Sequence, residues 1–320
     1  MASRTAGPEP ASSLGGPGWL PRAASHVEEL AGGVVWRPCG YRCEVAPLRE
    51  VLICRPPDSL ADLPDPRAWL MRRPVDLGRL REQAEAVAAT FRAHGVTVHV
   101  ATPPAQAPPN IVFARDLFLA TPHGVVVART ASAQRAGEER YISAALAALG
   151  LPILHTVTGT GTFEGADALW IDPETVAVAV GFRTNVEGVA AIGRVLADQG
   201  VSTVPVDLGP GAQHLLGAVT VVDHGLAAVH QTAATDRIRG LLRERGYRLV
   251  ELPADDGLLR ARGMNLVALA PGVVLMPAAA GTVRRALTGA GVDVHELDVS
   301  EYIKADGALG CLTGIVRRDQ

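Results

Sequence analysis

Lysine is almost missing from this sequence: Lys304 is the only one, so arginine supplies nearly all of the 30 basic residues. The 33 acidic residues bring the formal net charge to -3, which gives no general electrostatic reason to bind nucleic acid or an anionic membrane surface. No apolar run reaches about 18 residues, and the N-terminus has no basic region leading into an apolar core. We therefore expect a soluble, cytoplasmic protein with neither nucleic acid nor membrane as a partner.

Cysteine is also scarce, with four in 320 residues, which is too few for a disulfide scaffold. Cys39 and Cys43 have no second closely spaced pair of ligands, which argues against a zinc site. A dinucleotide site would need G-x-G-x-x-G, and the nearest pattern, GTGTFE from Gly159, lacks the third glycine. The sequence predicts neither a metal nor an organic cofactor.

The chain divides into an N-terminal extension and one domain. Residues 1–43 begin with a stretch rich in glycine, proline, alanine and serine that has neither a helical nor a strand period. We expect this extension to be disordered or irregular. Hydrophobic residues make up 48% of the whole chain, although only 4% are aromatic. Residues 44–320 are long enough to form a single domain with a large core.

One pattern returns five times in this domain: a helical stretch ends at a glycine, and a short run rich in β-branched residues follows. The steps between these glycines are 55, 50, 46 and 45 residues, which indicates structural repeats. The five are Gly95, Gly150, Gly200, Gly246 and Gly291. Each is expected to end its helix in the left-handed region.

The segments between these glycines read as helices and buried strands. In VDLGRLREQAEAVAATFRAHG the apolar residues from Leu77 to Phe91 share one helical face. Short apolar runs with a turn precede the helices, as in TPHGVVVA and DPETVAVAV, and predict strands. Five such units could form an open sheet or a closed ring. The constant spacing favours an α/β fold with five-fold pseudosymmetry, an αβ propeller whose strand ends meet at a polar centre.

Five polar residues interrupt apolar strand segments and come from different repeats or repeat edges. Taken one at a time, each has an ordinary structural explanation. Together, a cysteine, a histidine and carboxylates supply a nucleophile, a proton carrier and its partner for attack on an electrophilic carbon. An additional carboxylate suits a cationic substrate such as a guanidinium. The five are Asp116, Glu164, Asp167, His214 and Cys311.

The motifs around these residues resemble one enzyme superfamily. PNIVFARD, FEGAD, the isolated HLL and VSEYIKADGALGCLTGIV look like the pentein guanidino-group modifying enzymes. These include dimethylarginine dimethylaminohydrolases, arginine deiminases and amidinotransferases. The resemblance runs from about Glu44 to Arg318, with the motifs in the family's order. It implies a five-fold αβ propeller with the active site in its central channel, and a small guanidino compound as the substrate.

The resemblance also implies roles for individual residues. Cys311 corresponds to the nucleophile, His214 to the general acid and base, and Glu164 to the carboxylate that partners the histidine. Asp116 corresponds to a guanidinium-binding carboxylate, and Asp167 matches a structural acidic residue. No metal or organic cofactor is required.

Two arginines complete the expected substrate site. The family places an arginine 19 residues after each of two acidic motifs, and Arg135 and Arg183 stand 19 residues after Asp116 and Glu164. Both are expected to bind the α-carboxylate of an arginine-like substrate.

Two features separate this sequence from particular members of the family. Deiminases and amidinotransferases have an acidic residue two positions after the histidine, whereas Leu216 stands here and could border an N-alkyl substituent. The SE-x2-K-x-D-G spacing from Ser300 also points to a dimethylaminohydrolase. Those enzymes, however, often have acidic residues where Asn110 and Arg115 stand, and PNxxFxRD is the deiminase form. Asn110 and Leu216 are therefore counted among the substrate-binding candidates.

The first hypothesis is a cysteine-dependent hydrolase that cleaves a C–N bond of arginine or an N-substituted arginine and releases a ureido product such as citrulline. The alternative is an amidinotransferase that moves the amidino group to an amine acceptor. A noncatalytic binding protein on the same fold is a third hypothesis. The sequence leaves the substrate and the oligomeric state open, with a homodimer among the options.

Overall fold

The computed structural model describes residues 9–61 and 63–319. In these residues the strands form five three-stranded sheets. Each sheet has the same plan, because its central strand is antiparallel to one neighbour and parallel to the other. One helix connects the two parallel strands of each sheet. We call a sheet with its helix a module.

The five modules follow one another along the chain, and the strands of each are named in their spatial order. The first module contains β15 (Gly314–Arg318), β1 (Leu48–Cys54), β2 (Thr97–Ala101) and helix α2 (Leu77–Ala93), and the second contains β3 (Phe118–Thr121), β4 (Gly124–Val127), β5 (Ile153–Thr156) and α4 (Glu138–Ala148). The third contains β6 (Ala168–Asp172), β7 (Thr175–Val180), β8 (Ser202–Asp207) and α5 (Val186–Ala197), and the fourth contains β9 (Val219–Asp223), β10 (Leu226–His230), β11 (Arg248–Leu252) and α6 (Asp236–Glu244). The fifth contains β12 (Val267–Ala270), β13 (Val273–Pro277), β14 (Asp293–Leu297) and α8 (Gly281–Gly289).

The repeat predicted from the sequence is confirmed. All five repeat glycines have a positive φ, between 73° and 93°, and each follows the helix of its module. A residue with a Cβ is disfavoured in this left-handed conformation, which explains why glycine recurs there. The apolar face predicted for α2 is buried from Leu80 to Phe91. The α/β fold with five-fold pseudosymmetry is therefore the observed one.

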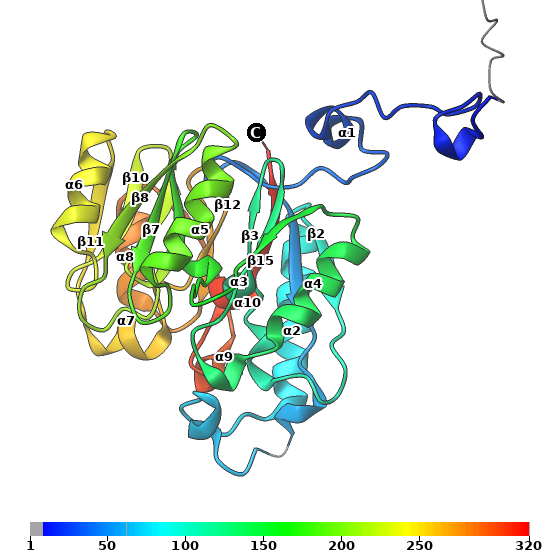
Figure 1. The fold of residues 1–320 in the computed structure, drawn as a ribbon. Coiled ribbons are helices and arrows are strands. Elements are labelled where there is room, and N and C mark those ends of the chain that lie inside the picture. The colour runs from blue at the N-terminus through cyan, green and yellow to red at the C-terminus, as the bar shows by residue number, and fades with distance from the viewer. Residues whose placement is uncertain (1–8, 62, 320) are drawn as a thin grey trace, which may run out of the picture.

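The first module is built from both ends of the chain. In the other four modules a tight turn joins the two antiparallel strands, whereas here β1 pairs with the C-terminal strand β15. Gly40 also forms a bridge with Arg317. Figure 1 shows the short helices α3 (Ala114–Leu117) and α10 (Leu309–Leu312) at the centre, between the modules. The polar residues predicted to meet at the centre lie on or beside such short turns.

The N-terminal extension contains more regular structure than expected. Residues 26–32 form helix α1 (His26–Gly32), because Ser25 and Glu28 make a reciprocal capping box and Gly33 ends the helix with a φ of 64°. Cys39 and Tyr41 are buried, so the packed body begins a few residues before the expected boundary at 44. Residues 1–8 lie outside the described residues, so the structure does not bear on the disorder expected there.

The remaining helices are α7 (Asp256–Ala261) and α9 (Ser300–Lys304). The core includes many strand residues with almost no exposure, such as Val126, Val178 and Val229. In the part of the chain that the structure describes, no helix combines the length and the apolar character needed to cross a bilayer.

Candidate active site

Each module contributes one polar side chain from the segment just before its first strand. Asp116 lies on α3 before β3, Glu164 precedes β6, and His214 precedes β9. Cys311 lies on α10 before β15. The fifth module contributes Asn265, two residues before β12, which the sequence analysis did not single out. The repeat itself was the available signal, since Asn265 occupies the position where the other four modules carry their polar residues.

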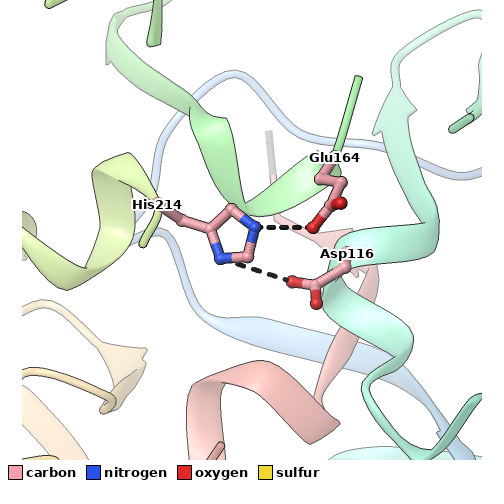
Figure 2. Close-up of side chains that lie close together, drawn as sticks. All are labelled: Asp116, Glu164 and His214. Atoms are coloured by element: carbon pink, nitrogen blue, oxygen red, sulfur yellow. Dashed lines mark hydrogen bonds and ion pairs between the residues drawn. The ribbon is translucent and has the colours of Figure 1, made fainter. Parts of the chain in front are cut away.

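His214 lies between two carboxylates (Figure 2). Its Nε2 is 2.7 Å from Glu164 Oε2, and its Nδ1 is 3.9 Å from Asp116 Oδ1. All three side chains are buried. Glu164 is the predicted partner of the histidine, and the structure brings the two together as expected.

The carboxylates keep His214 charged. Burial alone would lower the pKa of the imidazolium, but Asp116, Asp167 and Glu164 outweigh it and raise the pKa to about 9. Burial likewise opposes ionisation of Glu164, and the hydrogen bond and charge of His214 hold its pKa well below the usual value. At neutral pH the pair is therefore an imidazolium and a carboxylate, and the imidazolium can donate a proton.

Asp167 supports the backbone on which His214 sits. Its Oδ1 accepts a hydrogen bond from the backbone N–H of Leu215 at 3.0 Å, and its Oδ2 accepts one from the Thr184 hydroxyl at 2.6 Å. Burial raises the pKa of Asp167 to about 6. These contacts agree with the structural role expected for this residue.

Arg135, one of the two arginines expected to bind a substrate carboxylate, lines a cavity together with Asp116 and Cys311. Its guanidinium is buried, with 2% of the side chain exposed, and donates to Asp116 Oδ2 at 2.6 Å and to Glu138 Oε2 at 2.8 Å. Its Nη2 also donates to the carbonyl of Asn110. Every guanidinium nitrogen thus has an acceptor in the free protein, which fixes Arg135 beside Asp116. Its expected contact with a substrate carboxylate stays a prediction.

Three other predicted substrate residues lie around the site. The side chain of Arg183 is 11% exposed. Its guanidinium lies 3.3 Å from Glu164 Oε1 and stacks over the ring of Phe182. Asn110 is buried and donates to the carbonyl of Trp69 at 2.7 Å. Leu216 lines the same cavity as His214 and Cys311. Of these, Arg183 keeps guanidinium nitrogens that can face a ligand.

Cys311 is held by Asn265 from two sides. The Asn265 amide donates to Cys311 Sγ at 2.8 Å, and its Oδ1 accepts the backbone N–H of Cys311 at 2.9 Å. Burial and the nearby Asp116 raise the pKa of the thiol, while the Asn265 hydrogen bond opposes that rise. Cys39 and Cys54 lie in the core instead, where burial raises the pKa of each thiol to about 12.

A cavity of about 470 Å³ connects the polar centre with the surface. Asp116, Arg183 and Cys311 line its inner part. Asp116 Oδ1 is buried and has no hydrogen-bond partner among the described residues, although Arg135 binds the other oxygen of the same carboxylate. An unpaired buried carboxylate oxygen is costly, so it indicates a ligand that donates hydrogen bonds here.

The outer wall of this cavity is basic. Asp306 accepts hydrogen bonds from both Arg72 and Arg262, and all three residues line the cavity. Arg262 and Asp306 adopt positive φ values of 54° and 72°, and Leu70, which also lines the cavity, has a φ of 62°. Such backbone conformations are rare outside glycine and often occur at functional sites. The sequence analysis missed this group, which has no motif of its own.

The cluster of Asp116, Glu164 and His214 also has the composition of a metal site, with one ligand atom from each residue within 4.8 Å of the others. Arg135 Nη1, however, lies 2.6 Å from Asp116 and 3.6 Å from Glu164. A guanidinium therefore already neutralises these carboxylates, and it would repel a metal ion.

Comparisons with known proteins agree with this architecture. The arginine deiminase family model matches residues 89–231 and 218–318. The N(G),N(G)-dimethylarginine dimethylaminohydrolase of Mycobacterium tuberculosis is 30% identical over 252 residues, which cover 77% of this chain and 78% of that protein. The chain thus belongs to the arginine deiminase family, within the pentein superfamily of guanidino-group modifying enzymes.

Solved structures show the same fold. The dimethylarginine dimethylaminohydrolase of Pseudomonas aeruginosa, in complex with citrulline, matches with a TM-score of 0.69 and 21% identity over 85% of this chain and 100% of that one. An amidinotransferase of the saxitoxin pathway from Microseira wollei matches with a TM-score of 0.72 and 17% identity, covering 89% and 98% of the two chains. Within its family, this chain is similar to amidine hydrolases in sequence and shares its fold with an amidinotransferase.

Proposed function

We propose that this protein is a cysteine-dependent amidine hydrolase that cleaves a C–N bond in the guanidino group of an N-substituted arginine and releases a ureido product such as citrulline. One observation carries the proposal: Asp116 Oδ1 is buried, accepts no hydrogen bond among the described residues, and belongs to a side chain that lines a cavity together with Cys311. A guanidinium donates hydrogen bonds in a plane and can supply the donor that this oxygen lacks.

The cationic substrate would also activate the nucleophile. The Cys311 thiol has a raised pKa in the free protein, because burial and Asp116 both disfavour the thiolate. A bound guanidinium pairs with Asp116 and adds a positive charge, so it lowers the pKa of the thiol, which then loses its proton to solvent. The thiolate forms a C–S bond with the guanidinium carbon.

His214 would complete both halves of the reaction. Its imidazolium donates a proton to the departing amine as the C–N bond breaks, which leaves an amidino group on Cys311. The neutral imidazole then takes a proton from water, the oxygen bonds to the same carbon, and the C–S bond breaks to release the ureido product. If an amine acceptor replaced water, it would take the amidino group from Cys311, and the same intermediate would lead to amidino transfer.

The basic outer wall supports a substrate with a carboxylate. Arg183, Arg262 and Arg72 line the cavity together with Asp116 and Cys311, and Arg135, which lines it too, is paired with Asp116 and Glu138 in the free protein. A guanidino compound whose other end is anionic would pair with this wall. Leu216 would border the departing amine, where an apolar side chain favours an N-alkyl substituent.

The test is mass spectrometry of the products after incubation with arginine, N-methylated arginines and agmatine, with and without ornithine as an amine acceptor. We expect a ureido acid and free methylamine or dimethylamine from the methylated arginines. Transfer of the amidino group to ornithine would favour the amidinotransferase. Turnover of agmatine above that of the arginines would contradict a carboxylate-bearing substrate.

A further inference from the structure

A second group of buried charges lies inside the molecule, beside the catalytic residues. Arg115 follows Asn110 in the PNIVFARD segment, and Arg318 ends strand β15. Only 6% of Arg115 and 2% of Arg318 is exposed. Both residues line a cavity of about 110 Å³ whose wall also includes Cys311 and Glu44.

Tyr41 contacts both guanidinium groups, through a hydrogen bond to Arg115 and through its ring at 5.9 Å from Arg318 Cζ, but one nitrogen of each arginine has no partner in the described part of the chain. Arg115 Nη2 is 3.8 Å from Glu44 Oε2, beyond hydrogen-bond distance, and Arg115 Nε has no partner among the described residues. Arg318 Nη1 donates to the carbonyl of Ala46 at 2.9 Å, while its Nε is likewise unpartnered. Arginine nitrogens left unpaired in the interior are rare, because each costs desolvation energy that no hydrogen bond returns.

The charges at this end of the cavity do not balance. Arg115 and Arg318 bring two positive charges, and Glu44 brings one negative charge. Glu44 Oε1 also accepts a hydrogen bond from the backbone N–H of Trp170 at 3.1 Å. Tyr41 contributes no charge near neutral pH, because burial raises the pKa of its hydroxyl to about 12. Arginine stays protonated in proteins, so one positive charge is left over.

The other charged residues of the cavity wall cannot supply the missing negative charge. His214 is paired with Glu164 at 2.7 Å. Asp306 is already bound by Arg262 and Arg72. Cys311 is a thiol in the free protein, since burial raises its pKa.

We propose that this cavity binds one small monovalent anion between Arg115 and Arg318. A water molecule takes about 30 Å³ in the liquid, so a cavity of about 110 Å³ has room for a halide or nitrate ion together with water. The anion neutralises the residual charge and accepts hydrogen bonds from the two unpartnered guanidinium nitrogens. The cavity also reaches His214, Leu216 and Cys311, but the charge to be neutralised belongs to Arg115 and Arg318, so binding of the anion does not depend on the proposed reaction.

The test compares the thermal midpoint in chloride or nitrate with that in gluconate, an anion too large for the cavity, at constant ionic strength and pH. For the wild-type protein we expect a saturable rise of roughly 2–4 °C as either small anion replaces gluconate. Arg115→Gln should lose this rise. Glu44→Gln removes the competing negative charge and should lower the half-saturating concentration roughly three- to tenfold.

Arg72→Gln serves as the matched control, because Arg72 lies in the outer wall of the other cavity and not in this one. It should keep the wild-type response, and loss of the response in this variant would move the anion to the outer wall and overturn the proposal. A wild-type midpoint without a saturable component would also overturn it. If a variant does not fold, chloride-35 NMR line broadening of the wild-type protein, reversed by nitrate and unaffected by gluconate, provides the same test.

Discussion

His214 shows how burial and charge oppose each other at a single residue. The side chain is 4% exposed, and this burial favours the neutral ring, yet its pKa is raised to about 9 by carboxylates on three sides. Glu164 responds in the opposite direction, with a lowered pKa. Each group keeps its charge in this interior because opposite charges lie beside it: Asp116 and Asp167 add to the effect of Glu164 on His214, and Arg135 and Arg183 add to that of His214 on Glu164.

This coupling predicts a pH dependence of stability. Because the folded-state pKa of His214 is raised, its contribution to the free energy of unfolding is complete below about pH 6.5 and is lost as the pH rises through about 9. We expect the difference in thermal midpoint between wild type and His214→Gln to be largest near pH 6.5 and to shrink toward pH 10. His224→Gln, in the turn between β9 and β10, is the control. A difference that stays constant to pH 10 would contradict the raised pKa.

Cys311 can be tested as the nucleophile by substitution. We expect Cys311→Ser to reduce turnover at least a hundredfold, because a serine hydroxyl is not ionised at neutral pH and no other described cysteine lines the cavity. Its far-UV circular dichroism and thermal midpoint should stay close to those of the wild type. Cys43→Ser is the control and should remain active. Activity of Cys311→Ser above a hundredth of wild type would exclude this cysteine as the nucleophile.

Leu216 is expected to set the preference for the leaving group. Leu216→Asp adds a carboxylate to the cavity beside His214, where it can bind an unsubstituted NH2 group and disfavours a methyl group. The ratio of kcat/KM for arginine to that for N-methylarginine should therefore rise. Leu216→Asn, of similar size but without the charge, separates the electrostatic effect from the loss of apolar contact. An unchanged ratio in Leu216→Asp would argue against an N-substituted substrate.

At the scale of elements, close packing of helix α5 holds the segment that carries Glu164. The helix contains two glycines with different surroundings. A Cβ on Gly188 would lie 1.8 Å from the carbonyl oxygen of Thr162, two residues before Glu164, whereas a Cβ on Gly193 would be 3.6 Å from its nearest neighbour. The side chain of Asn185 adds a hydrogen bond to the backbone N–H of Thr162 at 2.9 Å.

This difference gives a matched pair of substitutions on one helix. Gly188→Ala should lower the free energy of unfolding by about 1–3 kcal/mol and reduce kcat, because it pushes α5 away from the Glu164 segment. Gly193→Ala should be neutral or raise stability by up to about 1 kcal/mol, since alanine favours the helix. Chemical unfolding measures the first effect and steady-state kinetics the second. Equal results for the two variants would show that this contact is not tight.

Sequence periodicity predicted the repeated elements because each one depends on local rules: an apolar face, a glycine in the left-handed region and a short apolar strand. It also found four of the five central residues, which interrupt apolar segments. Asn265 was missed because an amide beside a strand has no chemistry of its own until it contacts Cys311. The pairing of Arg135 with Asp116 was not predicted either, because this contact joins residues 19 positions apart and arises from tertiary packing that spacing alone does not reveal.

At the scale of the whole molecule, pairing of β1 with the C-terminal strand β15 closes the first module. β15 pairs with β1 through residues such as Ile315 and Val51, and β1 continues the same sheet to β2. Cys311 lies three residues before β15, so the position of the candidate nucleophile depends on this closure. The four other modules need no such contact between distant parts of the chain, because a turn joins their first two strands.

The first module is already built from two separate chain segments. We therefore expect that the chain can be cut at another loop when its present ends are joined. A circular permutant that fuses the C-terminus to the N-terminal extension and begins at Ala254, in the loop between β11 and α7, should fold and retain activity within about tenfold of wild type. The extension would then act as the connection between β15 and β1, as the turns do in the other modules. A permutant opened at Ala177, inside the buried strand β7, is the control and should not fold. Thermal unfolding and turnover of the two permutants provide the measurement. Loss of folding in both would show that β1 and β15 need free ends to pair.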